Sequence, residues 1–477
     1  MHTEMLIDGC FVGGPCDQSI GKQVIRSPFD GRIVGTAAEG GWTELRACID
    51  AANHAFQTWR NASKQDRQTL LRRIAELVRE RESELAELLC AEVGKPITAS
   101  LGEVARLAIT FDHAAELLED YGHESLSLES DPRGASYSCV VERFPRGVIF
   151  CIVPYNWPFN LAAHKIAPAL ATANTVIVKP SPLAPLTTMS LVRLIHEAGC
   201  PEGVINLWNG PAPVAQKGLA DQRIRMLSFT GSAEVGWKLK QLVTDRPVVL
   251  ELGGDASAII FDDADLDWAT QRIALGAYSY AGQICISIQH VRVQEAVYEE
   301  VKLKLIQATL ACPFGDPTLP ETVCGPLITD EAAEKVEAML SEAISGGATV
   351  LAGGQRQSRM FSPTLVENVP SDCRLAREEV FGPILTLSPF QHLTDAIQAV
   401  NASDYGIQTG IFTQSPTIAE MAYRDLEVGG VIINDFPTLR FDCMPYGGVK
   451  KSGFGREGVR CSMDEMTEPK TRLTKIS

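Results

Sequence analysis

The chain has 477 residues, 45% of them hydrophobic, which is enough for a sizeable core and on length suggests roughly two to four domains. Its 43 basic and 59 acidic residues give a formal net charge of −16, so neither nucleic acid nor an anionic membrane is expected as a partner. The 13 cysteines lack CxxC or Cys/His spacing, so we expect reduced thiols in the cytoplasm, with no disulfide framework and no metal site.

The first third of the chain is predicted to begin with hairpins and continue with helices. Residues 1–36 are short apolar pieces broken by Gly, Pro and Asp, which is typical of β-hairpins. No basic region precedes an apolar core there, and no apolar run approaches the ~18 residues of a membrane helix, so neither a signal peptide nor a membrane span is expected. Helical spacing predicts helices from Thr43, from Ser63 to near Gly94, and over residues 99–118.

Residues 121–143 differ from what precedes them. They are polar and Ser-rich, contain Asp131-Pro132, and then alternate from Tyr137 to Glu142. This pattern predicts an extended excursion from the main body of the protein, not a linker between independent domains.

From Gly147 the chain alternates between strand and helix. Strands are predicted at 148–153, 175–178, 204–208, 224–229 and 248–252, and helices at 161–173, 187–198, 214–220 and 232–242. The alternation indicates an α/β fold with a parallel sheet covered by helices on both faces. Ligands bind such sheets at the carboxyl ends of the strands, so polar clusters there are candidate sites.

A second α/β region follows Gly254. Helices are predicted at 266–280, 294–310 and 330–344, with strand-like runs at 384–387, 410–413 and 431–434. The Gly-rich stretch PYGGVKKSGFGREG at 445–458 is typical of turns, and residues 468–477 alternate as an edge strand would.

Polar clusters follow several of the predicted strands. In VPYNWP, Asn156 offers an amide that can stabilise an oxyanion, although an asparagine in a loop is often only a turn cap. Lys179 leaves an apolar strand and suits an anion or a ribose hydroxyl, unless it is merely solvated. In FTGSAEVG, Ser232 opens a helix and suits a phosphate, but the stretch is not GxGxxG and also fits an ordinary Ser-capped helix.

The stretch SYAGQICIS holds Cys285, and VVLELGGD, which precedes it, holds Glu251. A thiol and a carboxylate from neighbouring loops can form a covalent catalytic pair. A lone cysteine is otherwise usually buried and inert, and the sequence does not show what would lower its pKa.

Together these motifs resemble the NAD(P)-dependent aldehyde dehydrogenase superfamily. PYNWP, VKP, FTGS, ELGG, GQIC, EEVFGP and PYGGVKKSG occur in the family's order, and the matches run from about Leu6 to Gly455. The segments GQICIS and FTGSAEVGWKLK are similar to those of the branch that holds lactaldehyde, phosphonoacetaldehyde and non-phosphorylating glyceraldehyde-3-phosphate dehydrogenases.

The resemblance implies the chemistry. Cys285 attacks the aldehyde to give a thiohemiacetal, whose oxyanion lies between the Asn156 amide and the Cys285 N–H. Hydride transfer leaves a thioester, and Glu251 activates the water that releases the carboxylic acid. Coenzyme-A-acylating relatives commonly lack the acid at Glu251, but an acylating semialdehyde dehydrogenase and a catalytically silent binding or structural member of the fold remain alternatives.

The resemblance also implies a cofactor site for NAD or NADP. Lys179 and Glu379 are expected at the ribose hydroxyls, Ser232 at the pyrophosphate and Phe381 near the nicotinamide end. The other expected cofactor residues are Pro154, Tyr155, Ser181, Phe229, Gly231, Leu252 and Gly253. Many NAD-using members carry a glutamate where this chain has Pro182, so we hypothesise that NADP is accepted. The usual arginine five residues after the cysteine is His290, for which we have no interpretation.

The family's fold implies three parts. A Rossmann-like cofactor domain is expected over 1–120 and 144–250, a catalytic domain over 251–454, and a protruding oligomerisation element of strands over 121–143 and 455–477. The resemblance implies a homodimer or homotetramer.

A small polar or anionic aldehyde is the expected substrate. Arg106 and Arg440 fall in regions that border the substrate funnel in relatives. The alternative is that each arginine makes a structural ion pair.

Overall fold

An eight-stranded sheet organises the N-terminal half of the computed structural model, which describes residues 1–476. The strands lie in the order β22-β12-β11-β8-β9-β10-β2-β3. The central ones run parallel: β12 (Val248–Glu251), β11 (Ile224–Thr230), β8 (Val148–Ile152), β9 (Thr175–Lys179) and β10 (Ile205–Leu207). Antiparallel β22 (Gly453–Phe454), β2 (Met5–Ile7) and β3 (Cys10–Val12) complete the edges. The predicted parallel sheet is therefore confirmed.

Helices cover both faces of this sheet. α5 (Pro158–Ala171) and α6 (Pro185–Glu197) link β8, β9 and β10 on one face, while α7 (Ala212–Leu219) and α8 (Ala233–Leu242) return the chain on the other, together with α1 (Trp42–Trp59). Right-handed crossovers require this arrangement. Every residue of α5 is buried, because α2 (Lys64–Glu80) and α4 (Ile97–Leu117) pack over its outer side.

The single helix predicted from Ser63 to Gly94 is wrong. The chain forms two helices, α2 and α3 (Glu82–Val93), because Arg81 between them leaves helical geometry at φ −119° and ψ 23°. The change of direction lets α3 pack against α4 and α6. The apolar spacing on either side conceals the break, since neither Gly nor Pro marks it. Ser63 does cap α2 and Gly94 does end α3, as predicted.

A seven-stranded sheet organises the second α/β part, in the order β15-β18-β19-β14-β13-β20-β21. Its strands are β15 (Thr349–Ala352), β18 (Thr364–Glu367), β19 (Ile384–Phe390), β14 (His290–Gln294), β13 (Ser257–Ile260), β20 (Gln408–Phe412) and β21 (Gly430–Ile433). All but β15 run parallel. The core on one face is shared with α9 (Leu266–Tyr278) and α10 (Tyr298–Ala311), and on the other with α13 (Leu393–Asn401) and α14 (Pro416–Asp425).

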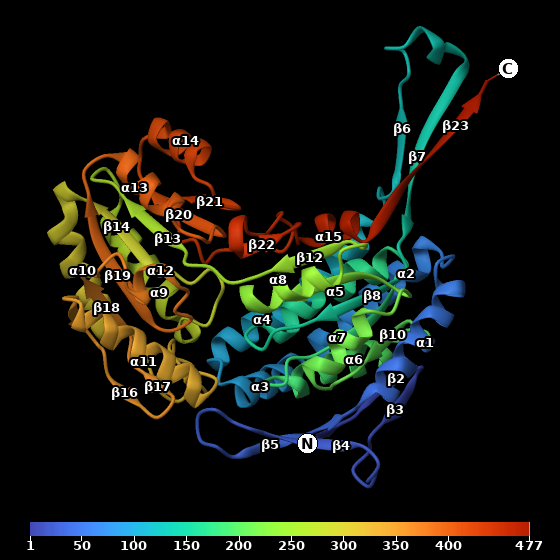
Figure 1. Cartoon of the computed structure of the whole chain (residues 1–477), viewed down its shortest axis with the longest axis horizontal. Coiled ribbons are helices and arrows are strands. Elements are labelled where there is room, and N and C mark those ends of the chain that lie inside the picture. The colour runs from blue at the N-terminus through green and yellow to red at the C-terminus, as the bar shows by residue number, and fades with distance from the viewer. Residues whose placement is uncertain (477) are drawn as a thin grey trace.

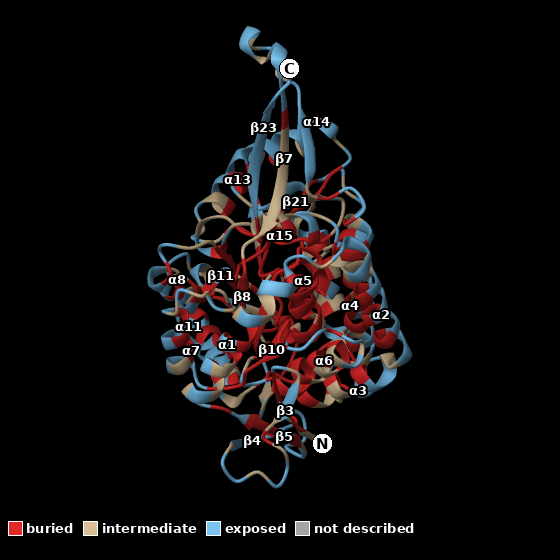
Figure 2. Ribbon diagram, turned by 90° about the vertical axis from the view of Figure 1, so that its right-hand side faces the viewer, coloured by how far each residue is buried: buried red, intermediate tan, exposed pale blue. Residues whose placement is uncertain are grey.

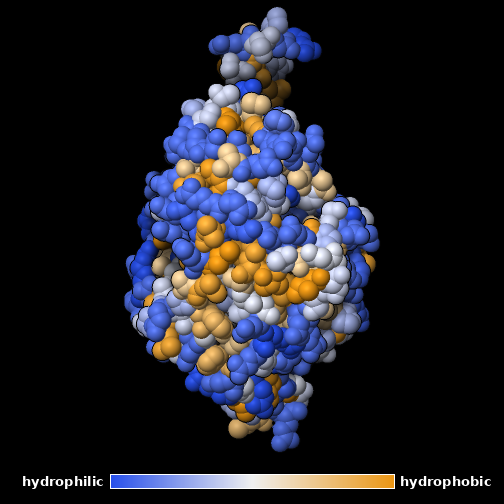
Figure 3. Space-filling view, turned by 90° about the vertical axis from the view of Figure 1, so that its left-hand side faces the viewer, coloured by the Kyte–Doolittle hydropathy of each residue, from blue (hydrophilic) through white to orange (hydrophobic). Residues whose placement is uncertain are grey.

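Two helix boundaries in this part differ from the prediction. Gln294 ends strand β14, because the pattern of buried and half-buried residues typical of a strand continues as far as Gln294. The helix α10 therefore begins only at Tyr298. α9 ends at Tyr278, where a kinked turn follows. α11 (Asp330–Ser345) lies close to its predicted bounds. Figure 3 looks onto the face of this part, where a band of apolar residues crosses an otherwise hydrophilic surface.

A three-stranded arm projects from the body (Figure 1). β7 (Tyr137–Pro145) lies between β6 (His123–Leu126) and β23 (Thr467–Lys475), and both pairings are antiparallel. Most of the arm is exposed (Figure 2). The excursion and the edge strand predicted from the sequence are both present, although Ser477 lies outside the described residues.

The proposed domain boundaries stay a prediction. The segment from β22 to α15 (Val459–Glu465) packs on the first α/β part, since β22 pairs with β12 and α15 contacts α5. The small remaining strands are β1 (His2–Thr3), β4 (Gly21–Arg26), β5 (Ile33–Glu39), β16 (Arg356–Gln357) and β17 (Met360–Phe361), and the short remaining helix is α12 (Arg374–Arg377). Within residues 1–476, no helix combines the length and apolarity that membrane crossing requires.

Candidate active site

The predicted site residues gather at one edge of the first sheet. Asn156 follows β8, Lys179 ends β9, Ser232 follows β11 and Glu251 ends β12. Strand register aligns these ends, because Ile152 pairs with Lys179 and Thr230 with Glu251. Parallel strands present their carboxyl ends together, so residues far apart in sequence become neighbours.

The turn that carries Cys285 has an unusual backbone. After α9, Tyr280 and Ala281 take φ values of 52° and 54°, and Gly282 takes 68°. A left-handed conformation is uncommon for non-glycine residues and tends to occur at functional sites. A Cβ on Gly282 would lie 2.2 Å from the carbonyl oxygen of Gly382, so the turn sits directly against the EEVFGP loop.

Asn156 is tied to this turn. It is only 5% exposed, and its Nδ2 donates to the carbonyl oxygen of Gln283 at 2.8 Å. The hydroxyl of Tyr155 donates to Oε1 of Gln283 at 3.3 Å. The loop after β8 is thus fixed to the chain two residues before Cys285, and the predicted oxyanion donor and nucleophile lie in one site. Asn156 is not the turn cap considered as the alternative.

Cys285 lies in an apolar setting with one polar neighbour. Its Sγ is hydrogen-bonded with the Tyr446 hydroxyl at 3.0 Å, and Ile284, Ile286 and Trp157 pack around it. Burial raises the pKa of the thiol to about 11, although the Tyr446 hydrogen bond opposes this. The thiol is therefore protonated at neutral pH, and its attack on a carbonyl requires a proton acceptor.

Glu251 is suited to accept protons. It is 2% exposed, and neither carboxylate oxygen has a hydrogen-bond partner among the described residues. Burial and the charge of Glu457 raise its pKa well above the usual range, against the effect of Arg440 and Lys165. A carboxyl with a raised pKa can exchange a proton near neutral pH, as a general base must.

Lys165 and Glu457 form a buried ion pair that our sequence reasoning missed. Lys165 Nζ donates to Glu457 Oε1 at 2.6 Å and to the Ser228 hydroxyl at 3.2 Å. Burial would raise the pKa of Glu457, but Lys165 and Arg440 hold it below the usual value. The sequence did hold a signal for a buried ion pair. Lys165 interrupts the apolar run of α5, and a buried charge has to be paired.

Tyr446 was also missed. It belongs to the PYGG motif, but the sequence assigns its hydroxyl no partner. Only the packed structure places that hydroxyl beside Cys285.

Lys179 and Glu379 are the residues predicted at the ribose hydroxyls. Lys179 is 6% exposed, burial lowers its pKa to about 8, and its Nζ donates to the carbonyl oxygen of Pro180 at 3.2 Å. Glu379 Oε1 accepts the N–H of Gly254 at 3.0 Å, and burial raises its pKa to about 7. A Cβ on Gly253 would lie 2.1 Å from Glu379 Oε2, so glycine leaves the carboxyl its place.

The remaining cofactor residues line the same edge. Ser232 makes no side-chain cap hydrogen bond to α8, unlike the ordinary Ser-capped helix considered as the alternative. Phe381 packs edge-on against Tyr155 at 6.2 Å between ring centroids. Pro154, Ser181, Phe229, Gly231 and Leu252 follow or end the strands β8, β9, β11 and β12. The amine of Lys179, the carboxyl of Glu379 and the N-terminus of α8 therefore fit a dinucleotide.

The two candidate substrate residues differ in their surroundings. Arg106 donates to both oxygens of Asp442, at 3.0 and 2.7 Å, so its charge is already paired. Arg440 is 6% exposed and stacks on the Tyr446 ring at 3.9 Å. Its Nη2 lies 3.8 Å from Glu457, and its Nε and Nη2 have no hydrogen-bond partner among the described residues.

Comparison with known proteins finds a family model described as the aldehyde dehydrogenase family, which matches residues 17–472. A 3-sulfolactaldehyde dehydrogenase of Priestia aryabhattai is 36% identical over 467 residues, 98% of each chain. The NADP-dependent glyceraldehyde-3-phosphate dehydrogenase of Bacillus halodurans C-125, solved with NADP, superposes with a TM-score of 0.96 at 34% identity over 100% of each chain. Aldehyde dehydrogenase 21 of Physcomitrella patens, solved with its product succinate, has a TM-score of 0.96 at 33% identity, covering 99% of this chain and 98% of that one.

Proposed function

The chain belongs to the aldehyde dehydrogenase family, and from that premise we propose that it oxidises a small anionic aldehyde to its carboxylate through Cys285. Oxidation of an aldehyde with NAD or NADP follows from membership of the family. The roles of individual residues and the charge of the substrate are our proposal.

Cys285 forms the covalent bond in the proposed reaction. Glu251 accepts the thiol proton, the sulfur attacks the aldehyde carbon, and the carbonyl electron pair moves to oxygen. Glu251 passes that proton to solvent before it acts on water in the later step. The amide of Asn156 carries two N–H donors, and because one is held by Gln283, the other is left for that oxygen. The backbone N–H of Cys285 is the second donor proposed for the oxyanion.

Lys179, Glu379 and Ser232 hold the cofactor in this proposal. Bound NAD(P)+ supplies the acceptor for the hydride that leaves the thiohemiacetal carbon, which becomes a thioester. Glu251 then takes a proton from water, the hydroxide attacks the thioester, and the Cys285 sulfur leaves as the carboxylic acid forms. The raised pKa of Glu251 supports its assignment as the base.

The environment of Arg440 is the single observation that supports an anionic substrate. A guanidinium with two nitrogens unpaired is costly to bury, unless a ligand completes its hydrogen bonds. It lies over Tyr446, whose hydroxyl contacts Cys285, so an anion bound there is close to the reacting carbon. Arg106 supports the loop through Asp442, which also accepts from Asn160 at 3.1 Å. Two of the relatives described above are named for a sulfonated or a phosphorylated aldehyde, and the third was solved with the carboxylate product succinate.

Substitution of Arg440→Gln tests this assignment. We expect kcat/KM for sulfonated, phosphorylated and carboxylated aldehydes to fall about 10- to 100-fold more than kcat/KM for an uncharged aldehyde of equal length, which is the value of a charge-assisted hydrogen bond. Loss of the Arg440 charge also raises the pKa of Glu251, and that effect is common to both substrate classes. Initial rates of reduced-cofactor formation measure both. Arg106→Gln is the comparison, and it should affect charged and uncharged aldehydes alike. An equal loss for both substrate classes in Arg440→Gln would reject the anion site.

The same assay addresses the cofactor and the alternatives. We propose that NADP is used alongside NAD, because Pro182 stands where a ribose-binding glutamate would exclude a 2′-phosphate. A preference for NAD of about 100-fold or more would contradict this. A product that forms only with coenzyme A would favour the acylating alternative, and a folded, cofactor-binding protein without turnover would favour the silent one.

Assembly and location are also proposals. The projecting arm supports a homodimer or homotetramer, in which the arm pairs with a neighbouring subunit. All 13 cysteines are free thiols, which supports action in the reducing cytoplasm.

A further inference from the structure

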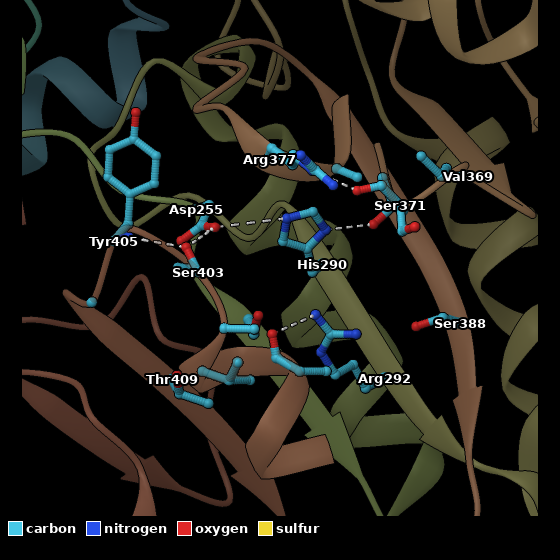
Figure 4. A pocket seen from close by; sticks show the side chains of 18 of the residues that line it. Asp255, His290, Arg292, Val369, Ser371, Arg377, Ser388, Ser403, Tyr405 and Thr409 are labelled. Carbon is cyan, nitrogen blue, oxygen red and sulfur yellow. Dashed lines mark hydrogen bonds and ion pairs between the residues drawn. The ribbon is translucent and has the colours of Figure 1, made fainter. Parts of the chain in front are cut away.

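A cavity of about 620 Å³ lies on the second sheet, apart from the proposed active site. Its floor is formed by residues 386–389 of β19 and by the first residues of β14, β13 and β20, and its walls by segments 368–377 and 399–407 (Figure 4). Neither Cys285, Glu251 nor Asn156 lines it. Its volume lies in the range of sites for small molecules.

The floor of the cavity is polar where a buried sheet is normally apolar. Thr386, His290, Ser257 and Thr409 are register partners across four neighbouring strands and form one row. Ser388 and Arg292 are partners in the next row. Strands of a parallel sheet covered on both faces are usually apolar throughout. The other half of the Ser388–Arg292 row follows that rule, because its register partners Ile259 and Ile411 pack beneath α13 and α14.

Several donors in the cavity have no acceptor. Arg292 Nε is shielded from solvent without a hydrogen-bond partner, and Thr409, 1% exposed, has an unpartnered Oγ1. Arg377 stands exposed at the rim, where its Nε donates to the Ser371 carbonyl oxygen at 2.7 Å. Arg292 Nη2 donates to the Ala399 carbonyl oxygen at 3.4 Å, and the charge of Asp255 acts on its guanidinium. The cavity therefore offers positive charge and hydroxyl donors that a bound anion would satisfy.

The opposite wall offers an acceptor. Asp255 accepts the Ser403 hydroxyl at 2.5 Å and lies 4.0 Å from His290 Nε2. Burial lowers the pKa of His290 to about 3, so the imidazole is neutral, and its Nδ1 is hydrogen-bonded with the Thr386 hydroxyl at 2.8 Å. Burial raises the pKa of Asp255 to about 6 against the charges of Arg292 and Lys450, and the ionised carboxyl suits a ligand hydroxyl.

We propose that this cavity binds a small hydroxylated phosphate monoester, with its phosphate at Arg292 and Thr409 and a hydroxyl at Asp255. Arg377 at the rim attracts the anion as it enters. A phosphate offers three acceptor oxygens, which match a guanidinium and surrounding hydroxyl groups.

Calorimetry on the full chain, without cofactor or aldehyde, tests the proposal. Ribose 5-phosphate and glycerol 3-phosphate are titrated, with inorganic phosphate and free ribose for comparison. We expect the esters to bind, and Arg292→Gln to weaken them about tenfold or more. Thr409→Val, which removes only a hydroxyl, should weaken them a few-fold and provides a second variant if Arg292→Gln does not fold.

Two control variants separate this cavity from other anion sites. Arg440→Gln changes the proposed aldehyde site, and Arg424→Gln changes an exposed arginine paired with Glu420. Ester binding should be unchanged in both. The proposal is overturned if no ester binds, if Arg440→Gln abolishes binding that Arg292→Gln leaves intact, or if inorganic phosphate binds as tightly as the esters. Since no turnover is involved, these outcomes do not depend on the aldehyde being identified.

Discussion

The charge of Glu457 acts on the proposed base, Glu251. Both carboxyls are buried, and each raises the cost of ionising the other, while Lys165 and Arg440 favour ionisation. Of the two, Glu457 is the one held ionised, by its pairing with Lys165. Glu251, which has no hydrogen-bond partner in residues 1–476, therefore carries the raised pKa.

Removing that charge by Glu457→Gln should shift the pH dependence of turnover. The pKa of Glu251 should fall, and because the base acts only when ionised, the acidic limb of the kcat profile should move to lower pH. The measurement is kcat against pH under conditions where thioester hydrolysis limits the rate. Glu457→Asp keeps the charge and should move the limb less. An acidic limb that did not move to lower pH in Glu457→Gln would show that the charge of Glu457 does not raise the pKa of the base.

At the scale of the element, the turn between α9 and Cys285 positions the nucleophile. Its left-handed residues and its contact with Gly382 fix the direction of the chain that carries the thiol. The sequence predicted a helix to residue 280, because helical spacing says nothing of a backbone that is strained by contacts with a distant loop. A catalytic group displaced by about 1 Å can lose about 100-fold in rate.

Substitution Gly282→Ala should therefore reduce kcat by about 100-fold in a protein that still folds. The added Cβ would meet the Gly382 carbonyl oxygen at 2.2 Å, and the turn has to shift. Steady-state kinetics measures the loss, and thermal unfolding checks the fold. Gly31→Ala is a matched control, because Gly31 has a φ of 74° but no heavy atom within 4 Å of the added Cβ. It should cost about 1 kcal/mol of stability and leave kcat unchanged. Equal kcat in both variants would show that the turn does not position Cys285.

At the scale of the whole molecule, the arm carries a long exposed strand at the edge of its own three-stranded sheet. β23 is an edge strand whose residues from Glu468 onward are exposed. Edge strands are usually shortened, charged or covered, and a long exposed one favours pairing with another chain. This supports the proposed assembly.

Truncation after Glu468 should lower the oligomeric state. It removes most of β23 but keeps Thr467, whose hydroxyl is hydrogen-bonded with that of Tyr121 at the base of the arm. Light scattering after size exclusion measures the mass. Truncation after Lys475 retains the strand and should leave the assembly unchanged. An unaltered mass in the shorter chain would exclude the arm as the oligomerisation element.

The sequence by itself determined the local secondary structure of this protein and the order of its motifs. Strand and helix alternation predicted the parallel sheet, because apolar periodicity and turn residues act over a few positions. The motif order led to the family, and the predicted strands put Asn156 and Glu251 at strand ends that meet because parallel strands share one edge. Cys285 was expected in a turn after a helix, and the structure places it there. Their catalytic roles stay predictions.

Only the tertiary structure decided how buried charges and hydroxyls are paired. It distinguished Arg106, held by Asp442, from Arg440, which retains free donors. It joined Lys165 to Glu457, almost three hundred positions later in the chain. It also aligned the polar row that includes His290 across four strands. The cost of burying a polar group depends on which partners surround it, and those partners come from segments that only the folded chain brings together.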